Sequence, residues 1–165
     1  MRKGTLFVCF LLLCVLLLSG CSAQGTTGTP AVTEAPAPTE APAADLVIPL
    51  SLLGEEPAFI DWMEGATAMQ LIGLRDADGT VRLAFNTCQS CGGSPYAYFE
   101  YQGDGVMQCQ NCGLLFRTAT VGSPKAAGCN PVTISEFTVD AESVTVPAAV
   151  LQANVGRFTN WKVFE

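Results

Sequence analysis

The order of hydrophobic and polar positions divides the 165 residues into three parts. Residues 6–18 form an uninterrupted apolar run, LFVCFLLLCVLLL, directly after the basic residues Arg2 and Lys3. Residues 22–44 have no apolar periodicity and consist largely of proline, threonine and alanine. In residues 45–165, short apolar segments recur between glycine-containing turns. That pattern is typical of a small β-rich domain.

The third part predicts antiparallel strands and one helix. Pairs of apolar segments flank Asp76-Ala77-Asp78-Gly79 and Gln102-Gly103-Asp104-Gly105, and each pair predicts a hairpin. A short C-terminal helix is predicted over AAVLQANVGRF, with Pro147 near its first turn. We therefore expect a mainly β fold, a small antiparallel domain. Its predicted strands are Leu46–Leu50, Thr67–Leu74, Thr80–Phe85, Tyr96–Tyr101, Val106–Gln108, Val132–Val139 and Val144–Val146.

The first part is typical of an export signal. Thirteen apolar residues are too few to cross roughly 30 Å of hydrocarbon as a helix, but they suit the apolar region of a signal peptide. The run ends in Leu18-Ser19-Gly20-Cys21, which resembles the lipobox of bacterial lipoproteins. The resemblance implies cleavage after residue 20 and a lipid on Cys21 that anchors the chain at the extracytoplasmic face of the cell membrane. A plain secretory signal or a short anchor is the alternative.

The middle part predicts a spacer. It contains Thr-Glu-Ala-Pro twice and no aromatic residue, so it cannot bury enough apolar surface to offset the entropy lost on folding. The expected organisation is a signal peptide over residues 1–20, a lipidated cysteine with a disordered linker over residues 21–44, and a metal-binding domain over residues 45–165.

Composition excludes several classes of function. The chain has no histidine, which rules out Ser–His–Asp and Cys–His catalysis and zinc sites that contain histidine. Its formal net charge of −7 opposes binding to a phosphate backbone, so we expect no nucleic-acid partner. No substrate-pocket motif is recognisable, and we expect no enzyme acting on a small organic substrate of its own.

The cysteines of the third part indicate a metal site. Cys88 and Cys91 form one C-x-x-C pair, and Cys109 and Cys112 form a second pair seventeen residues further on. Each pair is followed by glycine, which permits a positive φ and leaves backbone N–H groups free to face the sulfurs. Two such loops brought together by a hairpin predict a tetrahedral site of four thiolates.

The residues alone leave the occupant of this site open. Zinc and iron–sulfur centres both accept four thiolates, and the spacing places a structural zinc site first. Such a zinc domain would act as a protein-interaction module. Disulfides are a further alternative in an exported domain. A thiol–disulfide oxidoreductase using one C-x-x-C pair is another, although neither pair lies in a clear βαβ pattern.

Three separated motifs resemble the FtrD-like membrane iron–sulfur proteins: FNTCQSC over residues 85–91, VMQCQNCGLLF over residues 106–116 and GCNP over residues 128–131. The resemblance implies an iron–sulfur cluster and a role in electron transfer or iron handling linked to ferrous iron uptake, with a membrane iron transporter or a redox protein as partner. A weaker likeness is to Rieske domains, because Cys109-x-x-Cys112-Gly113-x-x-Phe116 is similar to their second ligand loop. The fold is thus expected to be Rieske-like or zinc-ribbon-like.

Cys129 is left over once four thiolates are assigned. It follows Gly128 and precedes Asn130-Pro131, whose proline restricts the residue before it to extended geometry and stiffens the loop. We expect its sulfur to lie near the metal, as an additional ligand or as a hydrogen-bonding group beside the ligands. The alternative is a buried cysteine that only packs the loop.

Overall fold

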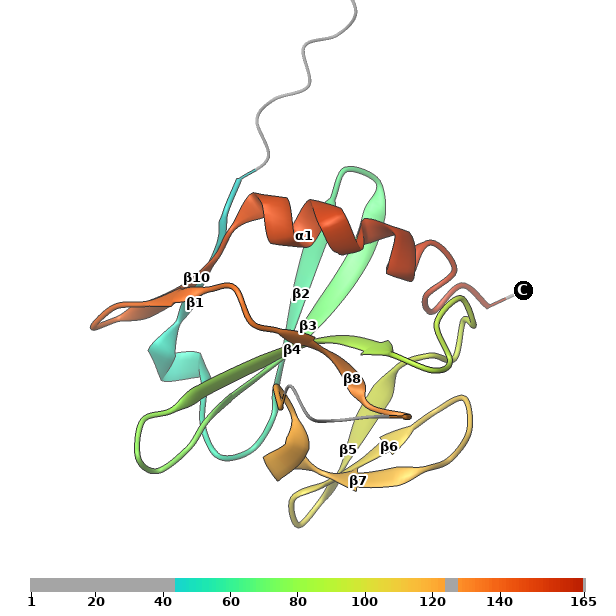
Figure 1. Cartoon of the computed structure of the whole chain (residues 1–165), viewed down its shortest axis with the longest axis horizontal. Helices are drawn as coiled ribbons and strands as arrows, with labels where there is room; N and C mark the ends of the chain where they lie inside the picture. The colour runs from blue at the N-terminus through green and yellow to red at the C-terminus, as the bar shows by residue number, and fades with distance from the viewer. Residues whose placement is uncertain (1–43, 124–127, 165) are drawn as a thin grey trace, which may run out of the picture. The chain divides into compact units, whose positions relative to one another are not determined.

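Three antiparallel β-sheets and one short helix make up the described part of the chain, residues 44–123 and 128–164, in a computed structural model (Figure 1). These described residues belong to one unit of the chain. The mainly β prediction with one short C-terminal helix is confirmed. The predicted signal, Cys21 and most of the linker lie outside the described residues.

The central sheet has four strands in the order β2-β3-β4-β8. β3 and β4 are buried on both faces along most of their length, whereas β2 alternates between half-buried and exposed positions. Two separate cores explain this difference, because one lies on each face of β3 and β4. The strands are β2 (Ala58–Glu64), β3 (Thr67–Arg75), β4 (Val81–Cys88) and β8 (Pro131–Ile134).

The first core lies between the central sheet and a cover formed by the sheet β1-β10-β9 and the helix α1. Leu71, Leu83 and Phe85 of the central sheet pack there against Leu151 of the helix and against Trp161. The indole Nε1 of Trp161 donates to the backbone carbonyl of Asn86 at 2.7 Å, which fixes the C-terminal segment on β4. The cover consists of β1 (Leu46–Pro49), β9 (Thr138–Val139), β10 (Ser143–Val146) and α1 (Ala148–Asn154).

The second core lies between the opposite face of the central sheet and the sheet β5-β6-β7. Ile72, Leu74 and Ala84 pack there against Phe99 and Met107. Cys88 and Cys109 belong to this core as well and are fully buried. The third sheet is formed by β5 (Phe99–Gly103), β6 (Val106–Cys109) and β7 (Leu115–Arg117).

Both predicted hairpins are present. β3 pairs with β4 through the predicted turn, in which Gly79 has a φ of 89° that a glycine adopts without strain. β5 pairs with β6 through the second turn, and β5 begins at Phe99, three residues later than predicted. Pro147 lies at the N-cap, directly before the helix.

Three features differ from the sequence prediction. Strands β2 and β7 were not predicted, and a single strand over Val132–Val139 is wrong. Strand β8, which pairs with β4, ends at Ile134. Phe137 then packs against the first core, and β9 pairs with β10 in another sheet. The valine and threonine pattern gives strand propensity, but it does not determine which sheet edge provides the hydrogen-bonding partner.

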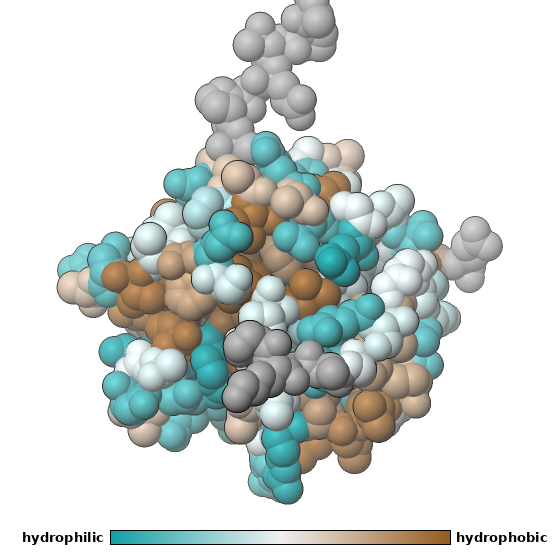
Figure 2. All heavy atoms as spheres, in the orientation of Figure 1, coloured by the Kyte–Doolittle hydropathy of each residue, from teal (hydrophilic) through white to brown (hydrophobic). Residues whose placement is uncertain are grey.

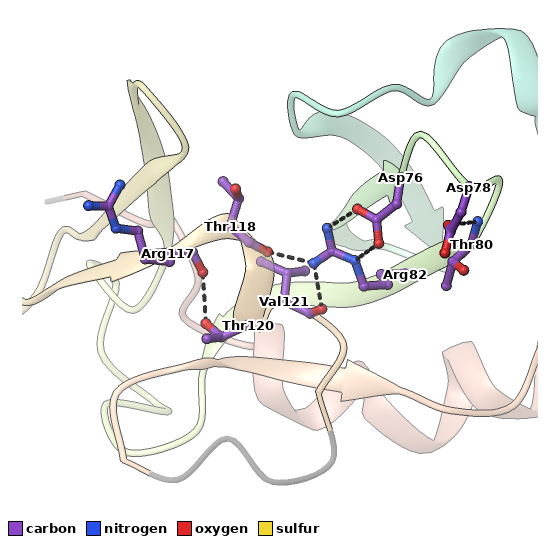
Figure 3. A network of polar contacts seen from close by, with 8 residues as sticks. All are labelled: Asp76, Asp78, Thr80, Arg82, Arg117, Thr118, Thr120 and Val121. Carbon is purple, nitrogen blue, oxygen red and sulfur yellow. Dashed lines mark hydrogen bonds and ion pairs between the residues drawn. The ribbon is translucent and has the colours of Figure 1, made fainter.

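A half-buried arginine fastens the third sheet to the central one. The Arg82 guanidinium binds both carboxylate oxygens of Asp76, with a shortest distance of 2.6 Å, and donates to the backbone carbonyls of Thr118 at 2.6 Å and Val121 at 3.2 Å (Figure 3). Thr118 begins the 3₁₀ turn Thr118–Thr120 that follows β7. One side chain therefore links the β3–β4 turn to the segment after β7.

We expect Arg82→Ala to lower the free energy of unfolding by about 2 kcal/mol, because it removes a charge-assisted network and leaves two carbonyls without their donor. Arg82→Lys keeps the charge but loses the two-pronged geometry, so it should recover only part of the loss. Urea unfolding measures both variants. Arg75→Ala, at an exposed arginine, is the matched control and should change stability little. Equal effects at both positions would contradict a specific role for Arg82.

Candidate metal centre

The two C-x-x-C loops begin at the buried ends of two strands. Cys88 is the last residue of β4 and Cys109 the last residue of β6. The backbone N–H of Cys88 donates to Ala97 at 3.0 Å, and that of Cys109 donates to Leu114 at 3.0 Å, so each loop folds back at once. Cys91 and Cys112 follow in these loops, half-buried and exposed respectively.

Backbone N–H groups face the sulfurs, as the glycine pattern predicts. The N–H of Cys91 donates to the Cys88 sulfur at 3.3 Å. The N–H groups of Asn111 and Cys112 similarly act on the Cys109 sulfur and favour its thiolate. Gly113 adopts a φ of 74°, which a side chain would strain, and it lets the loop close with its N–H 2.8 Å from the Cys109 carbonyl.

Polar contacts hold the two loops beside each other. The Ser94 hydroxyl donates to the side-chain oxygen of Asn111 at 2.6 Å and so bridges one loop to the other. Deeper in the fold, the buried Asn86 side chain accepts from the Phe99 N–H at 2.8 Å and donates to the Phe99 carbonyl at 3.2 Å. Asn86 thus gives Phe99 the two hydrogen bonds that a neighbouring strand would give it. It thereby holds β5 of the third sheet beside β4 of the central sheet. Asn86 was not among the predicted site residues, although it lies two residues before Cys88 in the FNTCQSC motif.

The loop before β8 carries Cys129 to the same place. The backbone N–H of Gln89 donates to Asn130 at 2.9 Å, and the Gln89 side chain donates to the Pro131 carbonyl at 3.1 Å. These bonds fasten the third loop to the first C-x-x-C pair. The Cys129 sulfur lies 3.2 Å from that of Cys88, 3.9 Å from that of Cys91 and 3.0 Å from that of Cys112.

All five cysteines of the described residues therefore meet in one cluster, and all are free thiols. The sulfurs that lie within 4.8 Å of one another are those of Cys88, Cys91, Cys109 and Cys129. Cys112 is outside this set of four, on the solvent side. The geometry thus groups Cys129 with three of the four predicted ligands, and the assignment of ligands stays a prediction.

The donor set fits a soft metal. Four thiolates without any imidazole are ligands of iron, zinc or iron–sulfur clusters. A tetrahedral ion with metal–sulfur bonds of about 2.3 Å requires sulfurs about 3.8 Å apart, which is close to the spacing of this cluster. Small side-chain movements would therefore suffice to bind one ion.

The cysteines of the metal-free cluster differ in pKa, because their side chains differ in burial and in hydrogen bonding. Burial raises the pKa of Cys109 to about 11 and also raises the pKa values of Cys91 and Cys129. A hydrogen bond from the Cys129 thiol, helped by the backbone N–H of Leu114, lowers the pKa of Cys112 to about 7. Near neutral pH, Cys112 is thus the thiolate that reaches solvent.

A family model described as membrane iron–sulfur containing protein FtrD-like matches residues 54–158, which include all five clustered cysteines. The chain belongs to the FtrD-like family. The resemblance seen in the cysteine motifs is thereby confirmed. Neither curated proteins nor solved structures gave a significant match.

Family membership and the cysteine cluster together identify an iron-related metalloprotein, in a family described as membrane-associated. Within residues 44–123 and 128–164, no helix has the length and apolar character needed to cross a bilayer.

We expect Cys112 to be the first thiol alkylated in the reduced, metal-free protein. Its reaction with iodoacetamide should rise with pH around a midpoint near 7, since only the thiolate reacts and the thiol predominates below that pH. Cys109 should stay unmodified until much higher pH. Mass spectrometry of peptides after brief labelling measures this order, with Cys112→Ser as control. Cys109 reacting before Cys112 would contradict it.

Proposed function

We propose that the protein is a lipid-anchored, extracytoplasmic iron–sulfur protein that transfers electrons or handles iron at the membrane surface. The observation that carries this proposal is the convergence of five cysteine sulfurs in a member of an iron–sulfur family. The link to ferrous iron uptake, and a membrane iron transporter or redox protein as partner, belong to the same proposal. The centre would serve as a carrier and not as an enzyme with its own organic substrate.

The position of the cluster supports exchange with a partner. Cys88 and Cys109 are fully buried, which shields the centre from water, whereas Cys112 is exposed. Leu114 and Leu115 follow Cys112 and are 53% and 57% exposed, and Figure 2 shows hydrophobic surface over the sheet β5-β6-β7 at the lower right. A partner that covers these leucines would approach the cluster on its exposed side, next to Cys112.

The spacing of the sulfurs favours one second candidate. Four thiolates within 4.8 Å suit a single zinc ion as well as a single iron. Zinc has no redox chemistry, so the domain would then be a structural module that binds a partner protein at the membrane surface.

Metal and acid-labile sulfide analysis of the full-length protein, purified anaerobically in detergent, tests the proposal. We expect iron and a visible charge-transfer spectrum that bleaches on reduction. A colourless protein with one zinc would favour the structural module. A metal-free protein that cycles two electrons would replace both with thiol–disulfide chemistry.

Membrane attachment is tested separately at the proposed lipidation site. Cys21→Ala should leave the signal uncleaved or release the protein from membranes, because the acylated residue is lost. The matched control is Cys14→Ala within the apolar run, which should be processed as in the wild type. Fractionation and gel mobility report both properties. Normal processing and membrane retention of the Cys21 variant would contradict lipid anchoring.

A further inference from the structure

We propose that one metal ion is held by the sulfurs of Cys88, Cys91, Cys109 and Cys129, and that Cys112 is an exchangeable fifth cysteine ligand through which the ion enters and leaves. This inference rests on the proposed function, since it requires that the cysteines bind a metal, and it narrows that function to iron handling through one ion that thiolates coordinate without bridging sulfide. It differs from the ligand set expected from the sequence, which contained Cys112 in place of Cys129.

The spacing of the four inner sulfurs indicates a single ion. The distances from Cys129 to Cys88 and Cys91, 3.2 and 3.9 Å, lie on either side of the value of about 3.8 Å for a tetrahedral site of four thiolates. The four sulfurs stay within 4.8 Å of one another. A cluster of several irons with bridging sulfides distributes its cysteine ligands over different irons, so it needs sulfurs farther apart than these four.

Cys112 is placed to exchange with Cys129. Its sulfur is 3.0 Å from that of Cys129. It is exposed, whereas Cys129 is half-buried. Cys112 therefore contacts Cys129, a member of the inner set, from the solvent side.

The exchange step conserves charge and needs no oxidant. The bond from the ion to the Cys129 sulfur breaks as a bond to the Cys112 sulfur forms, and the Cys112 proton passes to Cys129 across their contact. The ion keeps four thiolates and its oxidation state throughout. Once on Cys112, it is bound at the surface, where a thiolate or carboxylate of a donor or acceptor can reach it.

The loops explain why Cys129 is the ligand that leaves. Cys88 and Cys91 share one C-x-x-C loop, so if one of them releases the ion, the other keeps the loop beside the ion. Cys109 shares its loop with Cys112, so it can remain bound while Cys112 joins. Cys129 is the one inner ligand without a partner in its own loop. The two ligand sets thus form a closed state with Cys129 and an open state with Cys112.

The test compares Cys112→Ser with Cys129→Ser in the full-length protein in detergent. Each protein is loaded anaerobically with cobalt(II), whose spectrum reports four-sulfur coordination, and with zinc(II), whose release to a chromogenic chelator gives a rate. We expect Cys112→Ser to keep one ion, the four-sulfur spectrum and its affinity, while releasing zinc at least about tenfold more slowly. Cys129→Ser should bind through Cys112, about tenfold or more weakly, and release zinc faster.

Each other outcome overturns a definite statement. Weakened binding in Cys112→Ser with normal binding in Cys129→Ser would assign the ion to the set expected from the sequence. An unchanged release rate in Cys112→Ser would remove the exchange role. Two or more ions per wild-type chain would exclude the single-ion centre. These three results leave the proposed metalloprotein intact, whereas a wild type that binds no metal would overturn the proposed function itself.

Discussion

Sulfurs held in contact repel one another once they are ionised, so a cluster of five thiols is stable only when protons or a cation occupy it. The Cys129 sulfur lies within 3.9 Å of three others, and burial holds the pKa values of Cys91, Cys109 and Cys129 high. In the metal-free protein, the cluster therefore keeps most of its protons. Metal binding must displace them, which couples metal affinity to pH and to folding.

The fold imposes this crowding from three directions. The ends of β4 and β6 deliver the two C-x-x-C loops, and the loop before β8 delivers Cys129. Two polar side chains hold these segments together: Asn86 sets the distance between β4 and β5, and Arg82 fastens the segment after β7 to the central sheet. The remaining sheet and the helix close the first core on the other face. They support β4 without contributing a sulfur.

Burial gives chemically identical side chains different roles. Cys88 and Cys109 are fully buried in the second core. Cys112 reaches solvent and carries the lowered pKa, because it accepts a hydrogen bond from Cys129. A centre that is buried on its inner side and accessible on its outer side suits exchange of electrons or ions with a partner. The absence of histidine leaves thiolates as the soft ligands that bind the metal.

The sequence by itself determined the local features: the two hairpins, the short helix and the paired cysteine loops with positive φ at Gly93 and Gly113. These depend on contacts between residues close in the chain, and turn chemistry together with C-x-x-C spacing encodes them. The family followed from the same motifs.

Only the tertiary structure decided how the fifth sulfur is placed. Cys129 lies 41 residues after Cys88, and it reaches the cluster because β8 pairs with β4 and Gln89 binds the loop before it. The same long-range pairing ended the predicted strand at Ile134 and sent β9 to another sheet. Spacing in the chain cannot encode such pairing, because the edge of a sheet accepts any strand whose side chains fit the core beneath it.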